Sequence, residues 1–153
     1  MTPRRATPAD FDALVDTFTA SVRQLAASHY DSAQRDAWAP TEPDRAAWHA
    51  RYAALDLWLI EAAPASGGSP RVAGFLGGTA DGHLDLLFTA PGHERQGVAQ
   101  ALYREFEAHC RAHGARELFV EASLVARPFL ERQGYEVMEV QHVERCGVRL
   151  ARF

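Results

Sequence analysis

One segment, LDLLFTAPGHERQGVAQALYREFEAHCRAHG (residues 84–114), constrains the fold more than any other part of the sequence. It begins as an apolar strand, turns at Pro91-Gly92 and continues into a helix after Gly97. Apolar residues recur three and four positions apart over residues 98–112, which predicts a helix with one buried face. Gly114 is the expected end of that helix. Because the helix returns the chain to its own sheet, we expect the next strand to be parallel to the first.

The rest of the chain predicts one mixed sheet with flanking helices. Asp81-Gly82 is typical of a hairpin turn, and the strands before residue 90 are joined by short loops, so they should be antiparallel. The sequence therefore predicts a single α+β domain over residues 1–153. Helices are expected over residues 8–28, 32–38, 44–55, 98–112 and 126–133, and extended segments or strands over 4–6, 57–62, 71–78, 83–89, 117–122, 135–142 and 148–153.

Composition narrows the classes of function. The chain has 153 residues, 47% of them hydrophobic and 24% charged, as expected of a soluble globular domain. Its net charge is −4, without basic runs, which argues against nucleic-acid partners. It has no apolar run of membrane-spanning length and no apolar signal region near its start, so the expected location is the cytoplasm, away from membranes. Cys110 and Cys146 lack metal-ligand spacing, and Cys110 is expected to be a buried thiol. No metal is expected.

The start of the helix at residue 98 is a candidate anion site. The first turn of a helix has N–H groups without intrahelical acceptors, and its dipole adds partial positive charge, so a pyrophosphate can accept several hydrogen bonds there. Gly97 and the small Ala99 allow a ligand close to the backbone, and Arg95 can add a charged contact. The alternative is that Gly97 only shapes a tight loop. A P-loop would need Gly-Lys-Ser/Thr, and a Rossmann loop would need three spaced glycines.

The loop also resembles a known motif. Residues 94–99, ERQGVA, are similar to the acetyl-CoA-binding motif Gln/Arg-x-x-Gly-x-Gly/Ala of the GNAT superfamily of N-acetyltransferases. VEASLVARPFLERQGYEV (residues 120–137) resembles the next GNAT element, a strand, a short helix and a Gly-aromatic strand start. SHYDSAQRDAWAP (residues 28–40) and the final VERCGVRLARF resemble the YafP-like branch. The resemblance covers nearly the whole chain, although Glu94 replaces the usual Gln or Arg.

This resemblance implies a GNAT-type fold, an acetyl-CoA co-substrate and a cofactor site. In that fold the strands at residues 83–89 and 117–122 splay apart, and the pantetheine arm enters the gap. Phe129 is equally well explained as a core residue. The residues implied to contact the cofactor are Leu87, Phe88, Thr89, Arg95, Gln96, Gly97, Val98, Ala99, Ser123, Ala126 and Phe129.

The implied chemistry is acyl transfer to an amine. A free alkyl amine has a pKa of about 10.4, so a general base must remove a proton, while backbone N–H groups stabilise the oxyanion. Asp85 interrupts an apolar strand, and a carboxylate there must be paired, hydrogen-bonded or functional; we take it as the candidate base or amine-binding group. The family's usual general acid, a Tyr, is replaced by Leu130. His29, Tyr30 and Trp38 are expected to line the acceptor pocket.

Two functions follow from these residues. The first is an acetyl-CoA-dependent N-acetyltransferase that transfers the acetyl group directly to a small-molecule or peptide amine. The second is a CoA-binding regulatory module without transferase activity, suggested by Glu94 and Leu130. A homodimer is included among the expectations because homodimers are common in the family.

Overall fold

A single mixed sheet forms the centre of the structure, a computed structural model that describes residues 2–25, 43–64, 67–116, 118–122, 136–141 and 147–152. Within these residues the sheet has seven strands in the order β1-β2-β3-β4-β5-β7-β6. The strands are β1 (Arg4–Arg5), β2 (Asp56–Ala62), β3 (Arg71–Gly78), β4 (His83–Thr89), β5 (Leu118–Ala122), β6 (Glu136–Gln141) and β7 (Gly147–Arg152). The helices predicted over 32–38 and 126–133, and the predicted end of the first helix, lie outside the described residues.

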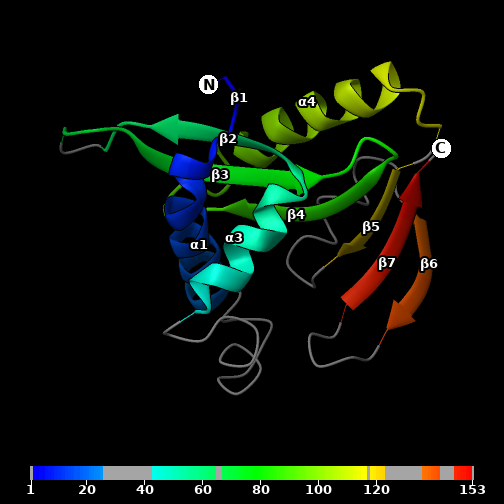
Figure 1. The fold of residues 1–153 in the computed structure, drawn as a ribbon, viewed down its shortest axis with the longest axis horizontal. Helices are drawn as coiled ribbons and strands as arrows, with labels where there is room; N and C mark the ends of the chain where they lie inside the picture. The colour runs from blue at the N-terminus through cyan, green and yellow to red at the C-terminus, as the bar shows by residue number, and fades with distance from the viewer. Residues whose placement is uncertain are drawn as a thin grey trace.

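Helices cover both faces of the sheet. Figure 1 shows α1 (Phe11–Ala20) and α3 (Arg45–Ala53) together on one side, and α4 (Val98–Ala112) on the other. A 3-10 turn, η1 (Pro8–Asp10), precedes α1, and a π-helical turn, η2 (Ser21–Leu25), follows it. The α4 bounds match the predicted residues 98–112, and Gly114 follows with a left-handed φ of 87°.

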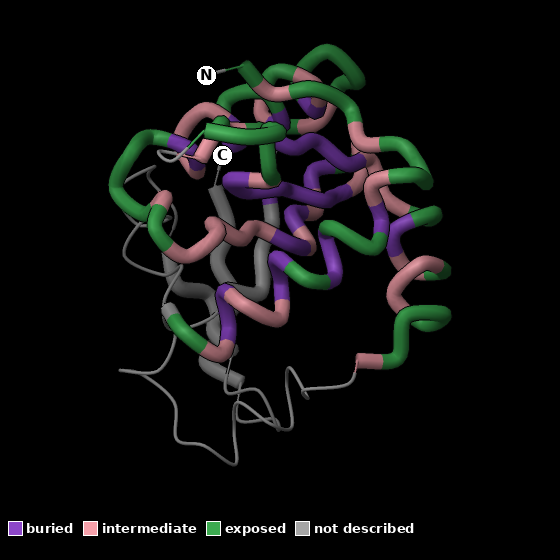
Figure 2. The backbone as a smooth tube through the Cα atoms, turned by 90° about the vertical axis from the view of Figure 1, so that its left-hand side faces the viewer, coloured by how far each residue is buried: buried purple, intermediate pink, exposed green. Residues whose placement is uncertain are grey.

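The core is divided by the sheet into two clusters, seen as buried segments in Figure 2. The first cluster lies between α4 and the sheet, and the second lies between the sheet and α1 with α3. The predicted buried face of α4 is confirmed, with Ala101 only partly buried and Tyr103 buried in addition. Cys110 is fully buried, and its burial raises the thiol pKa to about 11.

The strand directions agree with the expectation from loop lengths. β1 to β4 form antiparallel neighbours, and β4 runs parallel to β5 across α4. The pairing of β4 with β5 is short, because only His83 and Leu84 have partners, Phe119 and Val120. From Asp85 onward β4 has no further partner on the described part of β5. Among the described residues, the pairing therefore stops well before the Thr89 end of β4.

A bulge in β4 sets the direction of Asp85. Gly77 of β3 pairs with Leu86 and Gly78 pairs with Leu84, so Asp85 is an extra residue on β4. Leu84 packs in the cluster on the α4 side, whereas Leu86 packs in the cluster on the α1 and α3 side. The bulge thus changes the alternation of side chains at Asp85, whose carboxylate contacts α3.

The described residues contain no helix long and apolar enough to cross a membrane. Within the same ranges, no group of three or more His, Cys, Asp and Glu side chains is arranged to hold a metal ion.

The ion pair of Asp10 should make the stability of the protein depend on pH in the acid range. The Arg4 guanidinium donates to both carboxylate oxygens of Asp10, at 2.9 and 3.0 Å, and lowers its pKa to about 2. Because the folded pKa lies below the unfolded value, the contribution is present above about pH 4 and is lost as the pH falls toward 2. Since Arg4 is 44% exposed, we expect the ion pair to contribute only about 1 kcal/mol to the free energy of unfolding.

Urea unfolding at pH 7 and pH 2.5 measures how much stability is lost in acid. This loss should be smaller in Asp10→Asn than in the wild type, and the exposed Glu105→Gln should behave like the wild type. Equal acid losses in all three proteins would contradict this assignment.

Tyr52 carries a buried hydroxyl that has no hydrogen-bond partner among the described residues. The side chain is fully buried, and desolvation raises its pKa. Tyr52→Phe is therefore expected to leave the free energy of unfolding unchanged or to raise it by up to about 1 kcal/mol. Tyr103→Phe is the matched comparison, because the buried Tyr103 hydroxyl donates to Glu107 at 3.3 Å and its loss should destabilise by about 1 kcal/mol. Urea unfolding measures both, and a clear loss of stability in Tyr52→Phe would refute the assignment.

Candidate functional site

Gly97 begins α4 in a conformation that suits glycine. It is the N-cap residue, with a left-handed φ of 83°, and no side chain caps the helix. A Cβ atom added at Gly97 would meet nothing within 4 Å, so the space before the helix is open. The first-turn N–H groups of a helix point toward such a space without intrahelical acceptors. The anion site that the sequence predicts would use these N–H groups.

The turn before Gly97 is braced by its own side chains. Glu94 accepts a hydrogen bond from the Gly92 N–H at 2.8 Å, and the Gln96 amide donates to the Gly92 carbonyl at 3.2 Å. The His93 ring lies 3.2 Å from the Gln96 side-chain oxygen. The exposed Arg95 has a left-handed φ of 61°. The side chain of Gln96 therefore holds the loop, and sequence reasoning did not anticipate this bracing.

Gly74 of β3 fixes the start of α4 against the sheet. A Cβ atom at Gly74 would lie 2.5 Å from Val98 Cγ1 and 2.9 Å from the Phe88 carbonyl oxygen. Gly74 also pairs with Thr89, the last residue of β4. The loop of residues 90–97, here called the glycine loop, thus follows the end of β4. This end lies beyond the residues of β4 that pair with β5. The start of α4 therefore lies beyond the end of β4 at which no pairing with the described part of β5 is present.

Two of the predicted contact residues of β4, Leu87 and Phe88, have their side chains in the core layers. Leu87 packs on the cluster beside α4, and Phe88 packs on the opposite face, with its ring 4.9 Å from Phe18 and 5.7 Å from Phe75. Leu87 pairs with Leu76 of β3. Any contribution of these residues to a ligand in the gap would therefore be made through the backbone, as would that of the buried Val98.

Asp85 is held by an arginine of α3. The Arg51 guanidinium donates from Nη2 to Asp85 Oδ1 at 3.0 Å and from Nε to Oδ2 at 3.3 Å. The same guanidinium carbon lies 5.0 Å from the centre of the Trp48 ring. Both side chains remain accessible, with 32% of Arg51 and 24% of Asp85 exposed. At about 3.3 Å per residue, Thr89 lies about 13 Å further along the strand.

Arg51 is the functional candidate that sequence reasoning missed. It lies in the last turn of α3, three residues after Trp48, and only the tertiary fold places it beside Asp85. Trp48 packs against the rings of Phe18 and Tyr52. Outside the described residues lie His29, Tyr30, Trp38, Ser123, Ala126, Phe129 and Leu130.

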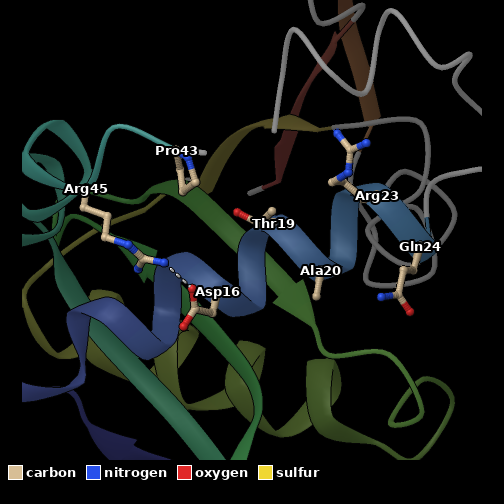
Figure 3. A pocket seen from close by; sticks show the side chains of 7 residues that line it. All are labelled: Asp16, Thr19, Ala20, Arg23, Gln24, Pro43 and Arg45. Carbon is tan, nitrogen blue, oxygen red and sulfur yellow. Dashed lines mark hydrogen bonds and ion pairs between the residues drawn. The ribbon is translucent and has the colours of Figure 1, made fainter. Parts of the chain in front are cut away.

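A separate pocket of about 440 Å³ opens on the outer side of α1 (Figure 3). The Asp16 carboxylate and the Arg45 guanidinium close one side of it with an ion pair of 2.7 Å. Arg45 begins α3, whereas Arg51 belongs to its last turn, so this pocket and the Asp85 pair lie at opposite ends of the helix. The residues that line the pocket are Asp16, Thr19, Ala20, Arg23, Gln24, Pro43 and Arg45.

The chain is similar to known acetyltransferases. The family model described as an acetyltransferase (GNAT) domain matches residues 62–153, which include the glycine loop and α4. Over 152 residues the chain is 32% identical to the protein called uncharacterized N-acetyltransferase YafP of Escherichia coli (strain K12), covering 98% of this chain and 91% of that protein.

Solved structures share the fold. A GCN5-related N-acetyltransferase from Rhodopseudomonas palustris, described as an aminotransferase of class II, superposes with a TM-score of 0.87 and 26% identity, covering 99% of this chain and 94% of that one. The PaiA N-acetyltransferase from Thermoplasma acidophilum, solved in complex with coenzyme A, superposes with a TM-score of 0.74 and 16% identity, covering 98% of this chain and 96% of that one.

Proposed function

Because this chain belongs to the GNAT acetyltransferase family, we propose that it transfers the acetyl group of acetyl-CoA directly to a primary amine of a small molecule or peptide. The observation that carries the proposal is the open, left-handed N-cap at Gly97, located where β4 has separated from β5. This end of the sheet combines a phosphate-binding backbone with a gap between strands. The coenzyme A bound by the Thermoplasma acidophilum protein supports the same co-substrate here.

The glycine loop would hold the pyrophosphate of acetyl-CoA through backbone N–H groups. Gly97 leaves room for close approach, and the N–H groups of Val98 and Ala99 belong to the first turn of α4. Arg95 is exposed on the same loop and supplies a guanidinium for a charge-assisted contact. Glu94 adds negative charge beside that site, so we expect it to weaken cofactor binding relative to the usual Gln or Arg.

The β4 backbone would hold the acyl end of the co-substrate. Beyond Leu84, β4 has no pairing with the described part of β5, and the proposed contacts of Leu87, Phe88 and Thr89 with the co-substrate are made through the backbone. An N–H group of that backbone can stabilise the oxyanion that develops on the thioester carbonyl. Ser123, Ala126 and Phe129 complete the proposed cofactor site on the other side.

Asp85 is the proposed base, acting on the amine or through a water molecule. Its two oxygens each accept one hydrogen bond from Arg51, and a carboxylate oxygen has a second lone pair available. Asp85 can therefore accept a proton or an ammonium hydrogen bond while Arg51 fixes its orientation. With Leu130 in place of the usual Tyr, the sulfur would leave as a thiolate, and His29, Tyr30 and Trp38 would line the acceptor side.

Asp85→Asn tests the proposed role directly. We expect kcat/KM to fall by about 100-fold or more, as is typical when a general base is lost, with little change in the Kd for CoA. The assay is release of CoA thiol over a panel of amines, amino acids and peptides, with calorimetry for CoA. Asp16→Asn is the control, because it removes a carboxylate that also pairs with an arginine of α3. Unchanged turnover in a folded Asp85→Asn protein would reject Asp85 as the base.

The same panel separates the second candidate function. The alternative, a CoA-binding module that regulates without transfer, is motivated by Glu94 and Leu130, which depart from the residues usual in the family. Turnover with any acceptor would reject that alternative, and absence of binding to any CoA thioester would reject both.

A further inference from the structure

Arg51 keeps hydrogen-bond donors that Asp85 does not use. The two bonds to Asp85 come from Nε and Nη2, so the two hydrogens of Nη1 are not part of this pairing. One third of the arginine side chain and one quarter of the aspartate side chain are exposed. A donor group and an acceptor group, held about 3 Å apart, are thus both within reach of a solute.

The charges of this pair favour one kind of amine. The Arg51 charge offsets that of Asp85, so the pair gives a simple cationic amine little net attraction. An amine that carries its own carboxylate is electrically matched to it, since the ammonium group can bind Asp85 while the carboxylate binds Arg51. Guanidinium groups bind carboxylates well because their donors lie in one plane.

The pair is also held rigidly. Two hydrogen bonds fix the plane of the guanidinium relative to the carboxylate, and the Trp48 ring lies against the guanidinium. The β4 bulge directs Asp85 toward α3 and lies where β4 leaves β5. A pre-arranged pair loses little conformational entropy when it binds a ligand of matching charge separation.

We propose that Arg51 and Asp85 together select an α-amino acid zwitterion as the acceptor, Arg51 binding its carboxylate and Asp85 its ammonium group. The proposal rests on the proposed transferase function for its chemical step but not for its binding step. In the chemical step the bound ammonium group first loses one proton to Asp85 or water. The neutral amine then forms the amide C–N bond as the thioester C–S bond breaks, the second amine proton passes to water, and coenzyme A leaves as the thiolate.

The experiment compares each of the twenty standard amino acids with its own carboxamide, which keeps the amine and removes the carboxylate charge. Release of CoA thiol is measured for the wild type, Arg51→Gln and Arg45→Gln. Glutamine retains part of the aliphatic stem of Arg51 and removes its charge. Arg45→Gln is the matched control, because Arg45 is also an α3 arginine paired with an aspartate.

We expect at least one free amino acid to be preferred over its carboxamide by the wild type. Arg51→Gln should raise KM for that amino acid about tenfold or more, as expected for loss of a charge-assisted bond, and should change KM for the carboxamide much less. Arg45→Gln should behave like the wild type.

Two outcomes would overturn the proposal. One is a wild type that uses carboxamides as well as, or better than, the free acids. The other is an equal loss for both substrates in Arg51→Gln, which would make Arg51 a positioning residue for Asp85 only. If no acceptor is turned over, the transferase function fails separately. Calorimetry then measures binding of the same amino acids to the CoA-saturated wild type and to Arg51→Gln. If the wild type does not bind them, or if both proteins bind them equally well, the proposed selection of amino acids is refuted.

Discussion

Replacement of Gly97 with valine should abolish measurable binding of coenzyme A. A β-branched residue at a φ of 83° is strained by about 1–2 kcal/mol, so the backbone would turn away from its present conformation. The first-turn N–H groups would then lose their common direction. Loss of two charge-assisted hydrogen bonds to a pyrophosphate weakens binding by about 100-fold or more. Calorimetry with CoA should give a micromolar Kd for the wild type and no detectable heat for Gly97→Val.

The control for this variant is Gly67→Val. Gly67 has nearly the same φ, 85°, and likewise has open space around an added Cβ, but it lies in the loop between β2 and β3. The two variants therefore carry similar backbone strain, and thermal unfolding should show similar losses of stability. CoA binding should survive in Gly67→Val. Binding that survives equally in Gly97→Val would mean that Gly97 only shapes the loop.

The second large effect is expected at Gly78, where the chain has no room for a methyl group. A Cβ atom there would lie 2.5 Å from the His83 carbonyl oxygen and 2.5 Å from the Phe106 ring. The carbonyl belongs to the strand backbone and the ring is fully buried, so neither can move freely. We expect Gly78→Ala to destabilise the protein by about 3 kcal/mol, the upper range for overpacking. Urea unfolding would measure this loss.

Gly68→Ala provides the comparison for Gly78→Ala. Gly68 has a left-handed φ of 106° and nothing within 4 Å of an added Cβ, so alanine there is strained but not crowded. Its cost should be about 1 kcal/mol. A loss in Gly78→Ala no larger than in Gly68→Ala would show that β3 and α4 yield easily at this contact.

Local signals predicted the elements of the fold well. The strand at residues 71–78 and the helix at 98–112 have the predicted bounds, because apolar periodicity and flanking glycines specify both within one short window. No local signal in the sequence marks the position of the bulge at Asp85. Its position depends on the register of β4 against β3, which depends on contacts between distant residues. The π-helical turn after α1 was not predicted either.

In the candidate site, too, local signals predicted some residues, whereas contacts between distant residues could not be predicted. Gly97 could be predicted as a site residue because a glycine directly before a helix is a signal that depends only on the neighbouring sequence. Asp85 could be predicted as a candidate because a charged residue in an apolar strand needs a partner. The partner itself, Arg51, could not be predicted, because it is distant from Asp85 in the sequence. Glu94 and Gln96 were interpreted by comparison with a motif, whereas in the structure their side chains form hydrogen bonds with the Gly92 backbone. Those contacts depend on rotamers, which a motif does not describe.

In the described residues, β4 pairs with β5 only through His83 and Leu84, near the centre of the sheet. Sheets usually add another extended chain at their outer strands. Among the described residues those outer strands are β1 and β6. An extended ligand with amide groups that bound beside β4 beyond Leu84 would instead act as a short additional strand in the interior. Binding of the proposed co-substrate would then extend the sheet from within rather than from its edge.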